Sequence, residues 1–112
     1  MSTSFRLLMF LNPVEGREDE FHEWYETTHL DDVLRTAGFH AAQRWGLEEV
    51  RGGMDMPLSH LAIYEVEADS AAEVLARLDS TRGERAGTDT IDSANSAVWL
   101  FSALGERHAV DL

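Results

Sequence analysis

The fold is decided by residues 19–40, Asp-Glu-Phe-His-Glu-Trp-Tyr-Glu-Thr-Thr-His-Leu-Asp-Asp-Val-Leu-Arg-Thr-Ala-Gly-Phe-His. Phe21, Trp24, Tyr25 and Thr28 follow the spacing i, i+3, i+4, i+7, which predicts an amphipathic helix over residues 16–28 with one buried face. Acidic residues fill its first turn, where they face the positive end of the helix dipole. Because the same stretch is rich in histidine, the helix can either pack a core or line a site.

The second half of this stretch predicts a change of direction. Thr27 and Thr28 are β-branched and their hydroxyls compete for backbone hydrogen bonds, so a break or kink is expected there. A short helix should follow from Leu30 to Ala37, with Gly38 as its C-cap. His29 would then lie at a helix junction.

On either side of this stretch, alternating or continuous apolar runs predict four strands, at residues 4–12, 39–48, 58–66 and 97–104. A second helix should begin at Ser70, because Ser70 and Glu73 have the spacing of a capping box. Residues 79–96 are polar and predict a long loop, of the kind that is often functional. The order strand, helix, strand, strand, helix, strand predicts a single domain over 1–112 with the α+β, ferredoxin-like βαββαβ fold: an antiparallel four-stranded sheet with helices on one face.

Both faces of residues 5–11 and 97–104 are largely apolar. Helices can cover only one face of such a sheet, so the other face needs a second cover. The simplest cover is the same face of a second copy, which predicts a homodimer closing into an α+β barrel.

Composition narrows the function. Nine Lys and Arg against 21 Asp and Glu give a net charge of −12, which repels phosphate backbones and anionic lipid, so no nucleic-acid or membrane partner is expected. Cysteine is absent, which excludes disulfides and thiolate chemistry. The sequence has no apolar run of transmembrane length and no leader-like start, so a cytoplasmic location is expected.

The strand ending in Asn12-Pro13, the run at 18–34 and the Gly38-Phe39 strand start resemble the dimeric α+β barrel superfamily, and within it the EthD-like group. That group carries a similar F-x-x-W-Y-x-x-x-H-L-P pattern in its first helix; here Asp31 stands where proline is expected. The resemblance implies the barrel fold and the dimer. The superfamily includes cofactor-free monooxygenases, cyclases, isomerases and haem-degrading enzymes, so the resemblance does not fix a reaction.

Three residues are candidate catalytic groups. His29 can act as a general acid or base near neutral pH, although a histidine at a helix junction is equally often a structural cap. Tyr25, one turn earlier, could donate a hydrogen bond to a substrate carbonyl, or lie in the core. His60 is the third; it shares a strand face with Tyr64 and is either a cavity residue or a satisfied core histidine.

The sequence predicts a small cofactor-independent enzyme that removes a proton from a hydrophobic, aromatic or polyketide-like carbonyl compound, leading to cyclisation, elimination or oxygenation. The pocket would lie between sheet and helices or inside the barrel. Its predicted substrate-binding residues are Trp24, Trp45, Tyr64, Trp99 and Arg44. His22 and Glu26 have only a faint metal-like spacing on an acidic, exposed flank, so no metal site is expected.

Two alternatives remain open: a non-catalytic EthD-like binding or accessory protein of an oxidative pathway, and a haem-binding oxygenase. Convergence of His29, Tyr25 and His60 on one cavity would favour the enzyme. Their separation would favour the binding protein.

Overall fold

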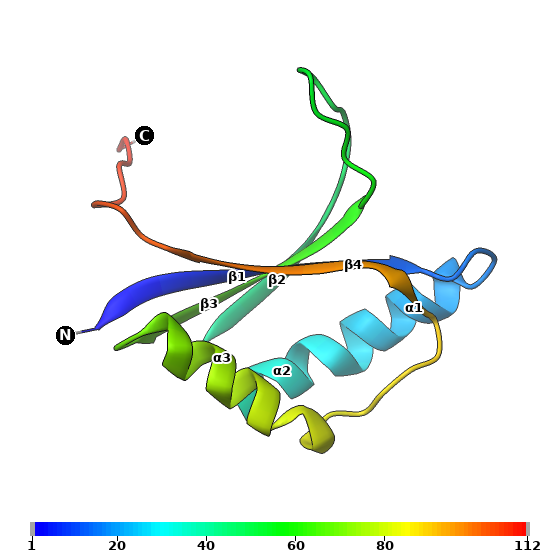
Figure 1. Ribbon diagram of the computed structural model, residues 1–112, viewed down its shortest axis with the longest axis horizontal. Helices are drawn as coiled ribbons and strands as arrows, with labels where there is room; N and C mark the ends of the chain where they lie inside the picture. The colour runs from blue at the N-terminus through cyan, green and yellow to red at the C-terminus, as the bar shows by residue number, and fades with distance from the viewer. Residues whose placement is uncertain (1, 112) are drawn as a thin grey trace.

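The apolar start of the chain forms an inner strand, β1 (Thr3–Pro13), of a four-stranded antiparallel sheet. The computed structural model describes residues 2–111. The sheet order is β2-β3-β1-β4, with β2 at Ala41–Gly46, β3 at His60–Ala68 and β4 at Ile91–Ser102. Helices α1 (Glu18–Trp24), α2 (Leu30–Ala37) and α3 (Ala71–Ser80) all lie on one face of the sheet (Figure 1). The ferredoxin-like α+β prediction is therefore confirmed.

The segment after α3 is more ordered than the predicted loop. It contains a 3-10 turn, η2 (Arg82–Glu84), and β4 then begins at Ile91 rather than at residue 97. Residues 91–96 are polar because β4 is an edge strand that is half exposed to solvent, so they lack the apolar alternation that marks a strand. β4 pairs with β1 on both sides of a register shift between Leu11 and Pro13: Ser96 lies opposite Leu11, and Ile91 lies opposite Pro13.

The interruption predicted at Thr27–Thr28 is a widened turn and not a break. Residues Tyr25–His29 form a π-helical segment, η1, that joins α1 to α2. The N–H of Leu30 donates to the carbonyl of Tyr25, five residues back. The Thr27 hydroxyl donates to the Glu23 carbonyl at 2.6 Å, which is the competing hydroxyl bond expected of a threonine inside a helix.

Both predicted helix caps are present. Gly38 ends α2 in the left-handed region at φ 76°. The Ser70 hydroxyl accepts from the N–H of Glu73 at 3.2 Å. The Glu73 carboxylate accepts in turn from the N–H of Asp69 at 3.2 Å, one residue before the position expected for a capping box.

The core lies between the sheet and the helices. Phe21 and Tyr25 from the first helical stretch pack on Leu7 of β1 and Tyr64 of β3, and all four are at most 2% exposed. Val33 of α2 completes this centre at 1% exposure. Trp24 and Thr28, which the helical spacing also placed on the buried stripe, are only half-buried. Thr28 lies inside the π-helical turn, which changes the direction of its side chain, whereas Trp24 precedes this turn.

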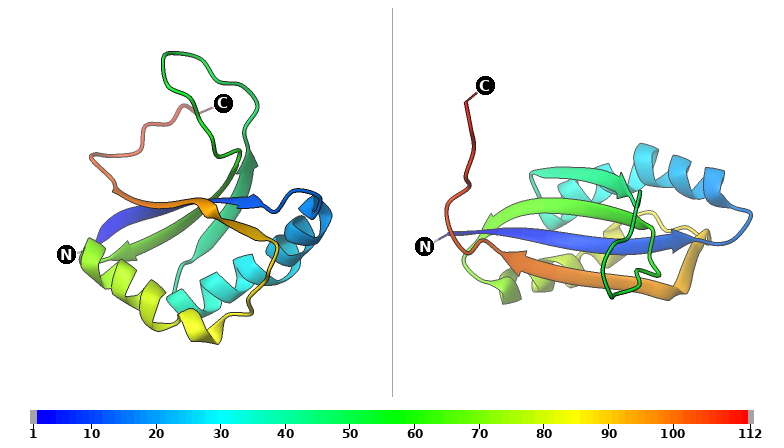
Figure 2. Two further views of the ribbon diagram at one scale, coloured as in Figure 1. Left: turned by 45° about the vertical axis from the view of Figure 1, so that its right-hand side comes forward. Right: turned by 90° about the horizontal axis from the view of Figure 1, so that it is seen from above.

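The other face of the sheet carries no helix (Figure 2). Trp45, Trp99 and Phe101 lie on it and are each about half exposed, at 51%, 47% and 53%. Trp99 packs edge-on against the buried Phe10 ring, with 4.9 Å between ring centroids. The loop 47–59 and the C-terminal segment both rise on this side of the sheet (Figure 1). They flank the surface that carries Trp45, Trp99 and Phe101, which is called the open face below.

Replacing Gly38 by alanine should lower stability without changing the fold. A non-glycine residue in the left-handed region costs about 1–2 kcal/mol, and the new Cβ would also approach the Arg77 guanidinium at 2.7 Å. Urea unfolding of Gly38→Ala should therefore show a lower midpoint. Gly83→Ala is the matched control, since a Cβ at that position meets nothing within 4 Å. Equal midpoints for the two variants would contradict the assigned cap.

Candidate functional site

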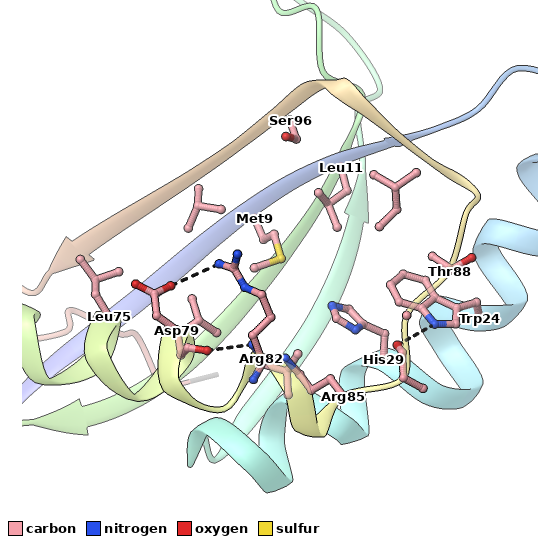
Figure 3. Close-up of a pocket in the computed structure, with 16 residues that line it drawn as sticks. Met9, Leu11, Trp24, His29, Leu75, Asp79, Arg82, Arg85, Thr88 and Ser96 are labelled. Carbon is pink, nitrogen blue, oxygen red and sulfur yellow. Dashed lines mark hydrogen bonds and ion pairs between the residues drawn. The ribbon is translucent and has the colours of Figure 1, made fainter.

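The helix-covered side of the sheet contains a cleft of about 640 Å³. Its walls come from β1 and β4 on one side and from the helices and the loop 85–88 on the other (Figure 3). Most of its lining is apolar: Met9, Leu11, Trp24, Val33, Leu75, Leu78, Ile91 and Val98. The polar lining consists mainly of His29, Asp79, Arg82, Arg85, Thr88 and Ser96. An apolar pocket with a few polar groups is the usual form of a small-molecule site.

His29, the last residue of η1, is a titratable side chain that lines the cleft. Its ring stacks on Trp24, with centroids 4.3 Å apart and planes inclined by 21°, and it meets Tyr25 edge-on at 5.1 Å. Its Nδ1 is buried and has no hydrogen-bond partner in residues 2–111. Burial, followed by repulsion from the Arg85 cation, lowers the pKa of His29 to about 4 from its ordinary 6.5. The imidazole is therefore neutral near pH 7 and can accept a hydrogen bond or a proton.

The loop 85–88 closes one side of the cleft and is fixed to the helices at Ala86. The Ala86 carbonyl accepts from the Trp24 indole N–H at 3.3 Å, and its N–H donates to the Asp32 carboxylate at 3.1 Å. This backbone bond, together with Arg35, lowers the pKa of Asp32. Trp24 therefore serves both as a cleft wall and as a support for the opposite wall.

Two arginines border the cleft and differ in their partners. Arg82 is exposed and pairs with Asp79 at 3.3 Å. Arg85 is half-buried and, among the described residues, donates only to neutral oxygens: the hydroxyls of Thr36 and Thr81, at 3.0 and 2.8 Å, and the carbonyl of Leu78 at 2.8 Å. Burial, followed by repulsion from Arg82, lowers the pKa of Arg85.

Tyr25 and Tyr64 lie behind the cleft and not in it. Both hydroxyls are buried and neither makes a hydrogen bond of good geometry among the described residues. Burial raises the pKa of both phenols, and each is near enough to affect the other. The Arg44 guanidinium lies over the Tyr25 ring at 4.6 Å, so Tyr25 is held between this cation on one side and His29 on the other.

A second polar cluster occupies the opposite side of Phe21. Arg44, with 14% of its side chain exposed, pairs with Glu26 at 3.1 Å and approaches Nδ1 of His22 at 2.7 Å. A guanidinium can only donate, so His22 must accept through an unprotonated Nδ1. The His22 and His60 rings are 5.2 Å apart. Burial lowers the pKa of His60, and the positive charge of the nearby Arg44 lowers it further.

This cluster corrects one expectation, because His22 is half-buried and does not lie on a fully exposed flank. Arg44 beside it is largely covered. The reason is that α1 and η1 cover the end of β2, where Arg44 points to the helix side of the sheet. The acidic Glu26 on that flank provides a counterion for Arg44 and does not mark a fully solvated surface.

The structure therefore does not bring the predicted site residues to one cavity. The cleft holds His29 and Trp24. The core holds Tyr25 and Tyr64, the second cluster holds His60 and Arg44, and the open face holds Trp45 and Trp99. The roles predicted for these residues stay predictions.

Sequence reasoning did not select Arg82 and Arg85 as site residues. The available signal was the polar segment 79–96 itself, a long loop between ordered elements in which two arginines stand three residues apart directly after α3.

Within residues 2–111, no three or more His, Cys, Asp or Glu side chains lie close enough together to hold a metal ion. No helix in the described part of the chain is both long and apolar enough to cross a membrane.

The fold and the cleft define a ferredoxin-like α+β protein with a small-molecule-sized pocket between its sheet and helices. Among solved structures, an EthD-like protein from Ralstonia eutropha JMP134 matches 96% of this chain over 97% of its own, with 14% identity and a TM-score of 0.54. An ethyl tert-butyl ether D (EthD) family protein from Bacillus halodurans C-125 matches 95% over 99% of its own, with 10% identity and a TM-score of 0.51. The chain thus has the fold of EthD-like proteins. No family model and no curated protein sequence matches it.

The lowered pKa of His29 makes a pH dependence of stability testable. Between about pH 6.5 and pH 4 the unfolded chain protonates this histidine and the folded chain does not, so stability is lost as the pH falls through this window. Discounted for partial exposure, His29 should contribute about 1–2 kcal/mol of the loss between pH 7 and pH 5.

His29→Gln removes the titrating group. The unfolding free energy of His29→Gln should therefore decline less over this window than that of the wild type, as measured by urea unfolding at several pH values. His40→Gln, at an exposed position, is the control and should follow the wild type. Parallel profiles for wild type and His29→Gln would show that burial does not hold His29 neutral.

Proposed function

We propose that the protein binds a small hydrophobic organic molecule in the cleft between its sheet and its helices, with the neutral His29 imidazole as the polar contact. The observation that carries this is the combination of a largely apolar cleft of about 640 Å³ with a buried Nδ1 that has no partner in residues 2–111. A buried polar atom without a partner costs free energy. A ligand that satisfied it would recover that cost.

A binding role is favoured over a catalytic role because His29, Tyr25 and His60 lie in three different surroundings. Only His29 lines the cleft, and the Tyr25 hydroxyl is enclosed in the core. A carbonyl compound in the cleft would therefore meet one of the three predicted catalytic residues and not all three. This supports the small-molecule-binding or accessory role, of the kind considered for EthD-like proteins.

Catalysis by His29 alone is the second candidate. A neutral imidazole aimed into an apolar cleft can take a proton from a carbon next to a carbonyl, the first step of cyclisation, elimination or cofactor-free oxygenation. The specific observation in its favour is the stacking of His29 on Trp24 at 4.3 Å, which fixes the ring in one orientation. Its low pKa weakens it as a base until a ligand changes its surroundings.

Ligand binding can be tested on Trp24, which lines the cleft. In a Trp45→Phe, Trp99→Phe background Trp24 is the sole tryptophan. Addition of 2-acetylnaphthalene, an apolar methyl ketone, should change Trp24 fluorescence with a saturable profile. Ser96→Phe, on the cleft wall at an exposed strand position, should strongly weaken this response by occupying part of the cleft, at unchanged circular dichroism. A response of unchanged strength in Ser96→Phe would place the ligand elsewhere.

The same ketone separates the two candidate functions. If His29 acts as a base, the protein should accelerate the exchange of the ketone methyl protons with deuterium oxide, followed by proton NMR. His29→Gln should then reduce the enzyme-dependent rate by about a hundredfold or more, the usual size of a general-base contribution. Ketone binding without protein-dependent exchange would assign the binding role.

The open face supports a homodimer as the second part of the proposal. Its exposed aromatic side chains and the two segments that rise beside it (Figure 1) form a surface that a second copy can cover. Sedimentation equilibrium should find a dimer that Trp99→Glu dissociates. Leu75→Glu is the control, because Leu75 is similarly exposed, at 39%, but lies on the helix side. A wild-type monomer at micromolar concentration, or dissociation by both variants alike, would contradict an interface on the open face.

A further inference from the structure

Building on the proposed binding function, we infer that the ligand of the cleft is an organic anion, an apolar body with a carboxylate or a similarly acidic group, and that Arg85 binds its charge. The geometry points to this through a half-buried guanidinium that lines an apolar cleft without an acidic partner (Figure 3).

The partners of Arg85 are all neutral. Its Nη1 donates to the hydroxyls of Thr36 and Thr81, and its Nη2 donates to the carbonyl of Leu78. No carboxylate in residues 2–111 forms an ion pair with it, although the chain has 21 acidic residues and a net charge of −12. A charge that is removed from water normally has a counterion. The absence of an acidic partner for Arg85 is therefore unusual in such an acidic protein.

The charges around Arg85 do not cancel it. Asp79, the acidic residue on the cleft wall, is engaged by Arg82 at 3.3 Å. Asp32, the nearest acid on α2, accepts from the Ala86 N–H and from Arg35 at 2.8 Å. His29 is neutral and brings no charge. Glu84, next to Arg85 in the chain, and Asp32 attract this cation from outside the cleft lining but form no ion pair with it. The charged side chains that line the cleft, Asp79, Arg82 and Arg85, therefore carry one positive charge in excess.

The donors of Arg85 also leave room for a ligand. A guanidinium has five N–H groups in a planar fork that matches a carboxylate, and three are used by the protein. The three neutral acceptors fix the orientation of the fork without lowering its charge. A bound carboxylate could then occupy the remaining donors while its apolar body contacts Trp24 and Met9 on the cleft wall.

The arrangement also has a purely structural explanation, in which Arg85 only ties the loop 85–88 to the ends of α2 and α3. If Arg85 had only this structural role, the protein would not prefer a charged probe over a neutral one. The matched probes are 2-naphthoate and 2-naphthamide, which share the ring and the carbonyl and differ in charge. Binding is measured by isothermal titration near pH 7.

Wild-type protein should bind 2-naphthoate about ten- to a hundredfold more tightly than 2-naphthamide, the range expected for charge-assisted hydrogen bonds. Arg85→Gln should abolish this preference, because it should lower the affinity for 2-naphthoate much more than the affinity for 2-naphthamide. Arg6→Gln is the control: it removes the same charge from the open-face side, where Arg6 pairs with Glu65 at 2.8 Å, and should keep the preference. Arg85→Lys keeps the charge but not the planar fork of N–H groups. This variant should retain part of the preference for 2-naphthoate.

The outcomes separate this inference from the function on which it rests. Equal affinities for the two probes in the wild type, both strongly weakened in Ser96→Phe, would overturn the anion preference and leave cleft binding standing. A naphthoate preference that persists in folded Arg85→Gln would also overturn it. Binding of neither probe, or binding that Ser96→Phe does not affect, would remove the proposed function together with the inference. If Arg85→Gln fails to fold, the wild-type comparison and Arg85→Lys still decide.

Discussion

The rest of the structure depends on the π-helical turn at Tyr25–His29. Phe21, Tyr25, His29, Val33 and Ala37 follow one another at intervals of four residues. In a regular α-helix each such step turns the side chain by about 40°, so Ala37 would point roughly 160° away from Phe21. The π-helical turn absorbs one residue, about 100°, and reduces this difference to roughly 60°. A single helical stretch can therefore keep one face on the sheet from Phe21 to Ala37.

The same turn separates two residues that a regular helix would treat alike. Tyr25 is at the start of the turn and is buried in the core at 2% exposure. His29 is at its end and reaches the cleft, where Trp24 stacks on it. The widened turn thus takes a titratable side chain out of the packed stripe without exposing it to bulk water. Burial at this boundary is what keeps the imidazole neutral near pH 7.

Much of the fold follows from local sequence rules. Gly38 and Ser70 mark their helix boundaries because left-handed backbone and N-cap bonding are local requirements, and both positions were found as expected. The early start of β4 was missed because an edge strand that pairs on one side tolerates polar residues. The π-helical turn was anticipated only as an interruption, because two threonines signal that a regular helix is disfavoured but do not specify what replaces it.

The site was less predictable, since it depends on which face of each strand meets the helices. Alternation placed His60 and Tyr64 on one face of their strand, but it could not say which face meets the helices. The observed register puts Arg44 opposite Ala62 and Gly46 opposite His60, so Arg44, His60 and Tyr64 all turn to the helix side. Trp45 and Trp99 then necessarily turn to the open face. Arg85 reaches the cleft from a loop, where no periodicity exists to reveal it.

The cleft and the cluster around Arg44 can be compared directly, because each contains an arginine on the helix side of the sheet. Arg44 has a carboxylate partner in Glu26 and an aromatic ring beneath it, and it closes an edge of the core without a cavity. Arg85 has neutral partners only, and the cleft lies beside it. Burial disfavours the Arg85 cation, and no carboxylate in residues 2–111 forms an ion pair with it, whereas Glu26 pairs with Arg44. An anion next to Arg85 would also remove one of the influences that lower the pKa of His29, so ligand charge and the basicity of the cleft histidine would be coupled through this one guanidinium.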